Sequence, residues 1–392
     1  MTGGEASGGG ASGGDASGRG AVVIAAGGTG GHMFPAQALA ETLRERGYRI
    51  VLVTDARGER YAAEFPCDDK RMVEAATFSG GGLAAKPAAA LAILRGVAES
   101  VQLFGRIKPV AVIGFGGYPS LPAMAAAVLR RTPSAIHEQN AILGRVNRAL
   151  APFVTKIAAG FPNMGRLPSG AAEKLVFIGN PVRAGVRAKA SAPYAAPEMG
   201  APVRLLIFGG SQGARILSQA VPAALADLPE PARGLLRIVQ QCRDEDIEAV
   251  RGAYEAAGIE AELAPFFKDM PERLEKAHLV ISRAGASTVS ELAVIGRPSV
   301  LVPFAAAMDD HQTANAGALE GAGACVCVSE AEATPGRLRQ EIVRLLQAPE
   351  RLGEMATTAG AVGRADAAAA LADLVVSIAG DARAPQQTGA AA

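Results

Sequence analysis

Tryptophan is absent from this sequence, and aromatic residues of all kinds make up only 4% of it. A chain of 392 residues with so few large rings must build its cores from aliphatic side chains and from close approach of the backbone. The four cysteines, Cys67, Cys242, Cys325 and Cys327, lack zinc-ligand spacing, and Cys-x-Cys is not a redox pair. We therefore expect all four to be reduced residues in the core of a cytosolic protein.

The sequence also lacks an excess of charge of either sign. A net charge of +1 and a pI near 7.7 provide no basic footprint, so we expect no nucleic-acid partner. The four histidines are scattered and no acidic cluster accompanies them, so the sequence predicts no metal site. No transmembrane helix is predicted, because the longest uncharged run, 109–129, is interrupted by glycine and proline.

Glycine, serine and alanine make up nearly all of residues 1–20, and residues 381–392 are similarly biased, so both ends are predicted to be disordered. Between them, apolar segments alternate with glycine-rich loops and helices, which predicts an α/β fold. The pattern passes a segment rich in alanine and proline at about 184–200 and then restarts. We therefore predict two doubly wound domains with parallel sheets, 21–183 and 184–362.

Short apolar segments predict the strands of these two sheets. In the first domain they are 21–26, 49–54, 110–113, 134–137, 156–159 and 175–178; in the second they are 203–208, 237–241, 259–263, 279–282 and 299–303.

Three glycine-rich loops, 27–32, 114–120 and 209–213, follow predicted strands. None has the G-x-G-x-x-G order or a P-loop ending, which disfavours a nicotinamide or flavin oxidoreductase. Each places small residues between a buried strand and a helix, where the backbone can approach a phosphate. One such loop alone is also explained by a tight turn, but three in tandem domains favour two phosphate-bearing ligands that meet in a cleft.

Polar and small residues are concentrated at 281–315. The spacing of Thr288 and Glu291 matches a capping box and predicts a helix that starts near Ser287. The amino terminus of a helix offers N–H groups to an anion. Glu291 would repel a phosphate and suits a diol such as ribose, although a capping role for its side chain explains the spacing equally well.

Two segments supply candidates for proton transfer. His32 follows the first glycine loop, and the ordinary pKa of a histidine suits the deprotonation of a sugar hydroxyl, so His32 is the candidate general base. Glu138, in the segment His137-Glu138-Gln139-Asn140, is the alternative. A purely structural role is the competing interpretation of each.

Seven motifs occur in the order and spacing of one family: GGTGGHMFPAQALA, GFGGYPS, HEQNAILGRVN, GNPVR, GGSQGA, SRAGASTVSEL and DDHQTANA. Together they resemble the MurG family, the peptidoglycan UDP-N-acetylglucosamine transferases that act on undecaprenyl-diphospho-muramoyl-pentapeptide. The resemblance covers about residues 20–380. It implies the GT-B glycosyltransferase architecture, two Rossmann-like domains facing across a cleft, with a last helix at 363–380 packing back on the first.

The resemblance also implies a reaction and its partners. The reaction is inverting transfer of GlcNAc from UDP-GlcNAc to the C4 hydroxyl of the muramoyl sugar of lipid I, giving lipid II and UDP without a cofactor. The partners would be UDP-GlcNAc, lipid I and the cytoplasmic leaflet of the bacterial inner membrane, contacted peripherally. A UDP-GlcNAc 2-epimerase, which shares the architecture and the donor, and a non-catalytic nucleotide-binding module remain alternatives.

The site residues that the resemblance implies come from both domains. Those implied for the donor are Thr29, Gly30, Gly31, Asn140, Arg183, Ser211, Gln212, Gly213, Phe267, Ala286, Ser287, Thr288, Val289, Ser290, Glu291 and Gln312. Those implied for the acceptor are Gly28, Gly116, Gly117, Tyr118, His137 and Asn147. Within the donor set, the Ser211 loop would meet the diphosphate, Glu291 the ribose and Gln312 the sugar hydroxyls. The Phe267 backbone would contact the uracil.

An amphipathic helix is predicted at 91–104, after a glycine-rich loop that contains Phe78 and Leu83. Leu94, Val97, Ala98 and Val101 share its apolar face. This face either packs on the protein's own sheet or, as the resemblance favours, the loop and the helix start contact anionic lipid, with Lys86 and Arg95 nearby.

Overall fold

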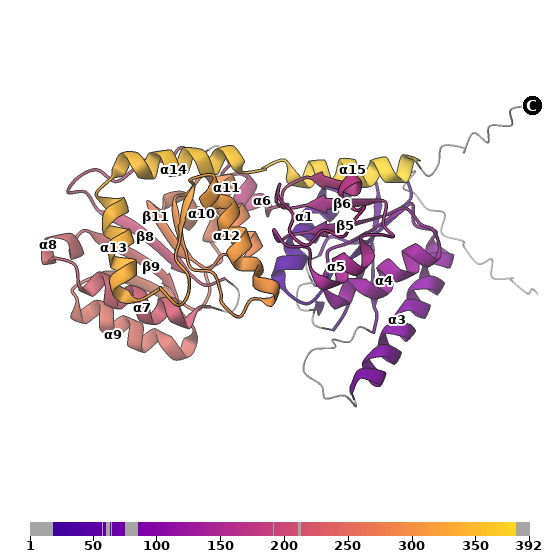
Figure 1. Ribbon diagram of the computed structural model, residues 1–392, viewed down its shortest axis with the longest axis horizontal. Helices are drawn as coiled ribbons and strands as arrows, with labels where there is room; N and C mark the ends of the chain where they lie inside the picture. The colour runs from indigo at the N-terminus through magenta and orange to yellow at the C-terminus, as the bar shows by residue number, and fades with distance from the viewer. Residues whose placement is uncertain are drawn as a thin grey trace, which may run out of the picture.

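The computed structural model describes residues 19–381, except 57, 60–62, 64, 75–84, 191 and 211–212. Most of the predicted leader, nearly all of the tail, and Ser211, Gln212, Phe78 and Leu83 therefore lie outside the described residues, as does the side chain of Lys86. Two lobes lie side by side along the long axis of the molecule, and each is built on one sheet (Figure 1).

The sheet of the first lobe has seven parallel strands in the order β3-β2-β1-β4-β5-β6-β7. They are β1 (Ala21–Ala25), β2 (Arg49–Thr54), β3 (Asp69–Met72), β4 (Ala111–Gly114), β5 (Ser134–Glu138), β6 (Lys156–Ala159) and β7 (Leu175–Phe177). Strand β3 was not predicted from the sequence, because its residues Asp-Lys-Arg-Met are mostly charged and lie at the edge of the sheet. The strand order reverses between β1 and β4, where doubly wound sheets bind ligands.

The second lobe repeats this pattern with six parallel strands in the order β10-β9-β8-β11-β12-β13. They are β8 (Val203–Phe208), β9 (Leu236–Gln241), β10 (Glu260–Ala264), β11 (Leu279–Ser282), β12 (Ser299–Leu301) and β13 (Cys325–Cys327). The last of these, only three residues long, is also missed by the sequence analysis. The expected α/β class and two Rossmann-like sheets are confirmed.

Helices and short helical turns connect the strands and cover the sheets. The α-helices are α1 (Gly30–Glu45), α3 (Ala85–Ile107), α4 (Gly117–Leu129), α5 (Arg145–Leu150), α6 (Ala184–Arg187), α7 (Arg215–Ala226), α8 (Glu230–Arg233), α9 (Ile247–Ala256), α10 (Met270–Lys276), α11 (Ala286–Ile295), α12 (His311–Gly321), α13 (Pro335–Leu346), α14 (Pro349–Val362) and α15 (Ala367–Asp381).

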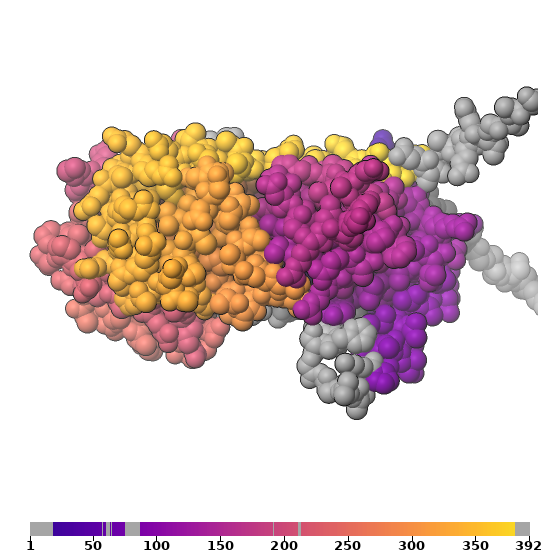
Figure 2. All heavy atoms as spheres, in the orientation of Figure 1, coloured from indigo at the N-terminus to yellow at the C-terminus, as the bar shows by residue number. Residues whose placement is uncertain are grey.

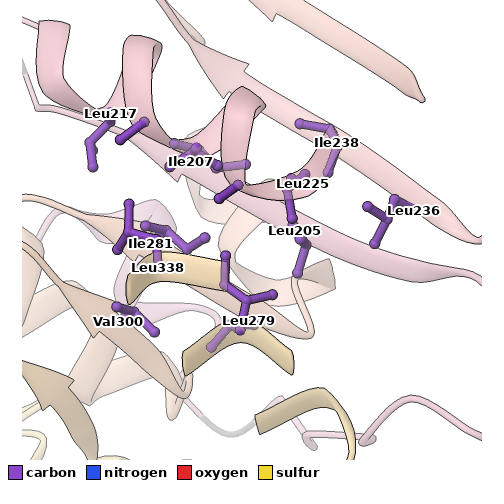
Figure 3. Close-up of a cluster of buried hydrophobic side chains, with 14 of the residues drawn as sticks. Leu205, Ile207, Leu217, Leu225, Leu236, Ile238, Leu279, Ile281, Val300 and Leu338 are labelled. Atoms are coloured by element: carbon purple, nitrogen blue, oxygen red, sulfur yellow. The ribbon is translucent and has the colours of Figure 1, made fainter. Parts of the chain in front are cut away.

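The cores lie on both faces of each sheet, which explains why β1 and β4, at the centre of the first sheet, are apolar throughout. In β1, Val22 and Ile24 pack with α1 and α15, whereas Val23 and Ala25 pack with α4 on the opposite face. In the second lobe, Ile207 and Ile281 of neighbouring strands pack with Leu217 of α7 (Figure 3).

The end of the chain crosses from one lobe to the other. Helix α14 packs on α11 of the second lobe, and α15 then lies on the first lobe against α1, β4 and β5 (Figure 1). Leu371 and Val375 of α15 are fully buried there. The crossing chain passes so close to Gly179 that a Cβ at that glycine would lie 2.6 Å from the Cβ of Arg364.

Helix α3 packs through a face other than the predicted one. Gly96, Ser100 and Phe104 are buried and face α4, where a Cβ on Gly96 would lie 3.2 Å from Pro122. Leu91 and Leu94 are 49% and 64% exposed. Of the apolar face that was expected either to pack on the sheet or to contact lipid, Leu94 and Ala98 are therefore exposed, whereas Val101 packs against the core.

In the described part of the chain, one helix has the length and composition of a membrane span: Pro87–Ile107 within α3, with a mean hydropathy of 1.3. This segment, which Arg95, Glu99 and Arg106 interrupt, was not singled out from the sequence; it meets the criteria of length and composition alone. Only 17% of its most apolar window is buried. Figure 2 shows one end of α3 standing away from the rest of the first lobe.

Candidate functional site

The carboxyl edges of the two sheets meet at the boundary between the lobes, which we call the lobe junction. Asn140, which follows β5, accepts a hydrogen bond from Asn315 Nδ2 of α12 at 3.1 Å. Asn315 Oδ1 in turn accepts one from the Ala141 amide at 2.8 Å. Asn180, which follows β7, donates to Ser290 of α11 at 2.9 Å. Asn140 and Ser290, both implied for the donor, are therefore each hydrogen-bonded to a residue of the opposite lobe.

The first two glycine loops lie against each other on the first lobe. A Cβ on Gly27 would lie 2.7 Å from the Cβ of Pro119, so only glycine permits this contact. Gly116 and Gly117 take φ angles of 81° and 69°, which place the start of α4 beside the start of α1. Thr29 is the exposed amino-terminal cap residue of α1. These loops bring most of the residues implied for the acceptor to one edge of the sheet.

His32 lies where the two loops meet. Its Nδ1 atom is 3.1 Å from Gln139 Oε1 at the end of β5. Its Nε2 atom lies 3.5 Å from the position that a Cβ would take on Gly117. Nε2 therefore lies beside the loop that the resemblance assigns to the acceptor. The residue is only half-buried.

Glu138, the alternative base, is buried and its two carboxylate oxygens are occupied. Oε1 accepts hydrogen bonds from the backbone and side-chain nitrogens of Asn140, both at 3.1 Å. Oε2 accepts from the Gly144 amide and from Asn147 Nδ2, both at 2.9 Å. A carboxylate used in this way holds the loop after β5 in shape, and the geometry favours His32 over Glu138 as the base.

His137 and Asn147 differ from the expectation that they contact the acceptor. His137 is fully buried, and its two ring nitrogens face the Gly179 carbonyl and the Gln139 side chain. Asn147 is buried as well and donates to the His137 carbonyl at 3.1 Å. Both side chains lie behind the loop surface and support it: His137 at the end of β5 faces the Gly179 carbonyl, and Asn147 of α5 packs against that strand end.

On the second lobe, α11 begins directly after the β11 turn. Its cap residue is Gly285 and no side chain caps it, so the predicted capping box of Thr288 and Glu291 is wrong. The helix starts at Ala286, and Thr288 lies buried inside the first turn. The amides of that turn have no partner within a helix, and the helix dipole adds positive potential at this end. The arrangement suits a diphosphate.

Glu291 forms an ion pair across the lobe junction instead of capping its helix. Arg183 NH2 lies 2.9 Å and Nε 3.3 Å from Glu291 Oε1, and the carboxylate is almost fully buried. Burial raises the pKa of Glu291, and the adjacent Arg183 guanidinium opposes this shift. Arg183 also lies over the ring of Phe34 at 5.1 Å. Arg183 therefore helps to keep a buried carboxylate ionised.

Replacing Arg183 by Met should make donor binding dependent on pH. Without the guanidinium, burial raises the pKa of Glu291 further, so the carboxylate becomes protonated as the pH falls and loses its affinity for a diol. The Michaelis constant for the donor should then rise by up to about tenfold per pH unit below that pKa. Measurements between pH 8 and pH 5.5 would check this, with Arg187→Met, an exposed neighbour in α6, as the control. Parallel profiles for the variant and the wild type would contradict it.

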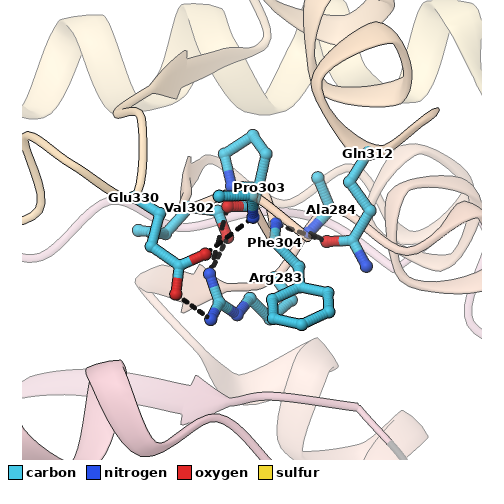
Figure 4. Close-up of polar contacts among 8 residues, drawn as sticks. Arg283, Ala284, Val302, Pro303, Phe304, Gln312 and Glu330 are labelled. Carbon is cyan, nitrogen blue, oxygen red and sulfur yellow. Dashed lines mark hydrogen bonds and ion pairs between the residues drawn. The ribbon is translucent and has the colours of Figure 1, made fainter. Parts of the chain in front are cut away.

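Gln312 braces two loops with its carbonyl oxygen (Figure 4). Oε1 accepts from the Ala284 amide at 3.2 Å and from the Phe304 amide at 3.0 Å. Its amide nitrogen enters no hydrogen bond within the described residues, so that group is the one available to a sugar. Next to it, Arg283 donates to the carbonyls of Val302 and Pro303 and pairs with Glu330 at 2.9 Å. This support was not predicted from the sequence, since Glu330 lies outside every recognised motif.

Gln241 is a second support that the sequence analysis misses. Its Oε1 accepts from the Gly209 amide at 3.2 Å, and its Nε2 donates to the carbonyls of Gly210 and Pro265 at 3.0 and 3.1 Å. It thereby ties the third glycine loop to the segment that precedes Phe267. A pocket of about 390 Å³ lies beside it and includes Gly213 in its lining.

Phe267 presents its backbone at this edge of the second lobe, because its side chain is fixed. The ring is buried, and the Arg273 guanidinium lies 4.1 Å from its centre. The main-chain N–H and carbonyl of Phe267 form no hydrogen bond with other described residues. They are therefore available to a ligand with a donor and an acceptor on one edge, such as a nucleobase.

Comparison with known proteins agrees with this geometry. The profiles of the glycosyltransferase family 28 N-terminal and C-terminal domains match residues 22–159 and 204–380. The chain is 50% identical over 357 residues to a UDP-N-acetylglucosamine--N-acetylmuramyl-(pentapeptide) pyrophosphoryl-undecaprenol N-acetylglucosamine transferase of Paramagnetospirillum magneticum, covering 91% of this chain and 96% of the relative. A protein of the same name from Caulobacter vibrioides is 49% identical over 353 residues, covering 90% and 97% of the two chains.

Solved structures give the same result. The crystal structure of MurG from Acinetobacter baumannii superposes with a TM-score of 0.75 at 31% identity, covering 91% of this chain and 99% of that one. A UDP-GlcNAc 2-epimerase from Neisseria meningitidis, bound to UDP-GlcNAc, has a TM-score of 0.64 at 10% identity, covering 91% and 99%, and shares the fold alone. Fold and domain matches together define a glycosyltransferase of GT-B architecture. Within that class, the chain belongs to the MurG family.

Proposed function

We propose that this chain transfers GlcNAc from UDP-GlcNAc to the C4 hydroxyl of the muramoyl sugar of undecaprenyl-diphosphate-linked muramoyl-pentapeptide, with inversion at the anomeric carbon. The observation that carries the proposal is the placement of the two candidate sites at the lobe junction. On one side, His32 Nε2 lies beside Gly117. On the other, the free start of α11 precedes Glu291 by little more than a turn.

The residues divide the work of the reaction between the lobes. The acceptor hydroxyl oxygen attacks the anomeric carbon of GlcNAc while the bond from that carbon to UDP breaks. His32 Nε2 takes the hydroxyl proton as general base. The amides at the start of α11 and the loop that contains Gly213 stabilise the negative charge that develops on UDP. Glu291 holds the ribose diol, and the Gln312 amide nitrogen donates to the transferred sugar.

The experiment that tests this function is incubation of the protein with UDP-GlcNAc and a short-chain lipid I analogue, followed by mass analysis. The expected product is the analogue with one added GlcNAc, together with UDP. An epimerase would alter UDP-GlcNAc without the acceptor, and a binding module would leave both compounds unchanged. No group of three His, Cys, Asp or Glu side chains that could hold a metal is found in the described part of the chain, so the yield should be unaffected by EDTA.

We also propose that the outer face of α3 contacts the cytoplasmic leaflet of the bacterial membrane. The exposed Leu91 and Leu94 provide apolar contact, and Arg95, Arg106 and Lys108 at the same helix are exposed. One Lys or Arg near an anionic surface contributes about 1 kcal/mol, so binding should be reversible and sensitive to salt. An enzyme placed in this way reaches a lipid-linked acceptor without spanning the bilayer.

Replacing both Leu91 and Leu94 by Ser should weaken binding to anionic vesicles about 10²–10⁴-fold, because a buried leucine is worth roughly 1.5–3 kcal/mol and both are lost. Turnover of a water-soluble acceptor should be unchanged. Co-sedimentation with phosphatidylglycerol vesicles would measure the affinity. Met199→Ser, which removes an exposed apolar side chain from the alanine- and proline-rich segment 184–200, is the matched control. Equal vesicle affinity of the double variant and the control would place the membrane contact elsewhere.

A further inference from the structure

A series of hydrogen bonds connects the Gly179 carbonyl to His32 through two buried side chains. His137 Nε2 lies 3.2 Å from Gly179 O, and Gln139 Nε2 lies 3.0 Å from His137 Nδ1. Gln139 Oε1 then lies 3.1 Å from His32 Nδ1. Because His137 and Gln139 are buried, bulk water does not compete for these bonds. We call these four groups the imidazole relay.

The direction of every bond in the imidazole relay follows from its first member. A carbonyl oxygen can only accept, so the ring proton of His137 is on Nε2. Burial lowers the pKa of His137 to about 4, which keeps the ring neutral with a single ring proton. His137 Nδ1 is therefore an acceptor and must face an N–H donor. This requirement orients the Gln139 amide with its nitrogen toward His137 and its oxygen toward His32.

The consequence for His32 is a defined tautomer. Since Gln139 Oε1 accepts, His32 Nδ1 donates and carries the proton, and Nε2 keeps its lone pair. We propose that Gln139, oriented by His137 and the Gly179 carbonyl, is a positioning residue that holds His32 with a free Nε2 facing the acceptor loop. This role of Gln139 rests on the proposed function, because it takes His32 as the general base of that reaction. There, the acceptor oxygen bonds to the anomeric carbon, UDP leaves with the electron pair of the broken bond, and the hydroxyl proton passes to Nε2.

A simpler role for the imidazole relay would be to satisfy buried polar groups without any effect on proton transfer. The two roles can be distinguished by experiment. Only in the positioning role does a change at residue 139 alter both the tautomer of His32 and kcat. Protein labelled with ¹⁵N-histidine contains four histidines, and the His32 signals are those missing from His32→Ala. At pH 8.5, long-range ¹H–¹⁵N spectra should show His32 with a protonated Nδ1 and an unprotonated Nε2.

Two substitutions at Gln139 distinguish the effect of the accepting oxygen from the effect of the size of the side chain. Gln139→Leu removes the oxygen, so the Nε2–H form should become populated. With the proton-accepting atom blocked, kcat should fall about ten- to a hundredfold while the donor KM changes by less than about twofold. Gln139→Glu keeps an oxygen toward His32, and the O–H of its buried, protonated carboxyl group can donate to His137 Nδ1 in place of the amide, so it should restore the Nδ1–H form and most of the turnover. Gln37→Leu, a partly buried glutamine of α1 outside the relay, is the matched control and should leave both properties unchanged.

The proposal is overturned if wild-type His32 carries its proton on Nε2, or if Gln139→Leu leaves the tautomer and kcat unchanged. It is overturned equally if Gln139→Glu has the tautomer and turnover of Gln139→Leu. Should Gln139→Leu fail to fold, the wild-type spectrum and the Gln139→Glu variant still decide. Failure of the proposed function is a separate result, namely no GlcNAc transfer by the wild-type protein, and the tautomer is measured independently of it.

Discussion

His32→Ala should lower kcat about 10²–10⁴-fold, the usual contribution of a general base, while the KM for UDP-GlcNAc changes by less than about twofold. The reason is geometric: the ring lies between the first two glycine loops and, among the described residues, is hydrogen-bonded to Gln139, so its removal leaves the second lobe unchanged. Steady-state kinetics with a water-soluble acceptor would give both constants.

Two further measurements make the His32 prediction specific. A histidine base is inactivated by protonation, so the loss of kcat that acid causes in the wild type should be missing from the residual activity of His32→Ala. Added imidazole should restore part of the turnover. A variant with near-normal turnover would exclude His32 as the base and transfer the role to Glu138 or to water.

Glu291→Ala should raise the KM for UDP-GlcNAc roughly ten- to a hundredfold and change the acceptor KM by less than about twofold. A hydrogen bond to a charged group is worth about 1.5–3 kcal/mol, which corresponds to this range. Arg183 pairs with Oε1, and the other oxygen of the carboxylate has no hydrogen bond among the described residues. The ribose can therefore bind without breaking the ion pair. Initial rates over a range of donor concentrations would measure the effect.

Removal of a buried, paired carboxylate also costs stability, so the Glu291 prediction needs a control that shares this cost. Glu341 of α13 is equally buried and pairs with Arg337 and Arg344, remote from the lobe junction. Glu341→Ala should lower the melting temperature and leave the donor KM unchanged. If Glu291→Ala behaves like Glu341→Ala, with lost stability and normal donor binding, the carboxylate has only a structural role.

Local sequence was sufficient for most strands and for the loops that follow them. Val203–Phe208 and Lys156–Ala159 form strands with the predicted bounds, because each contains a short apolar run that is buried in the sheet. The glycine loops after β1, β4 and β8 were predictable for a related reason, since each turn has positive φ angles that glycine adopts without strain. The order of the motifs indicated the family, but they did not show which side chains touch.

The contacts that make the site were decided by the tertiary structure. His32 meets Gln139 across 107 residues, and Arg183 meets Glu291 across 108, distances at which a sequence pattern carries no information on pairing. The same pairing explains why the capping box failed: Thr288 and Glu291 have the right spacing, but the packing of the lobes gives Glu291 a cationic partner. The helix α3 shows the same limit, because its amphipathic pattern was visible in the sequence, while the face that remains open was set by the approach of α4 to Gly96.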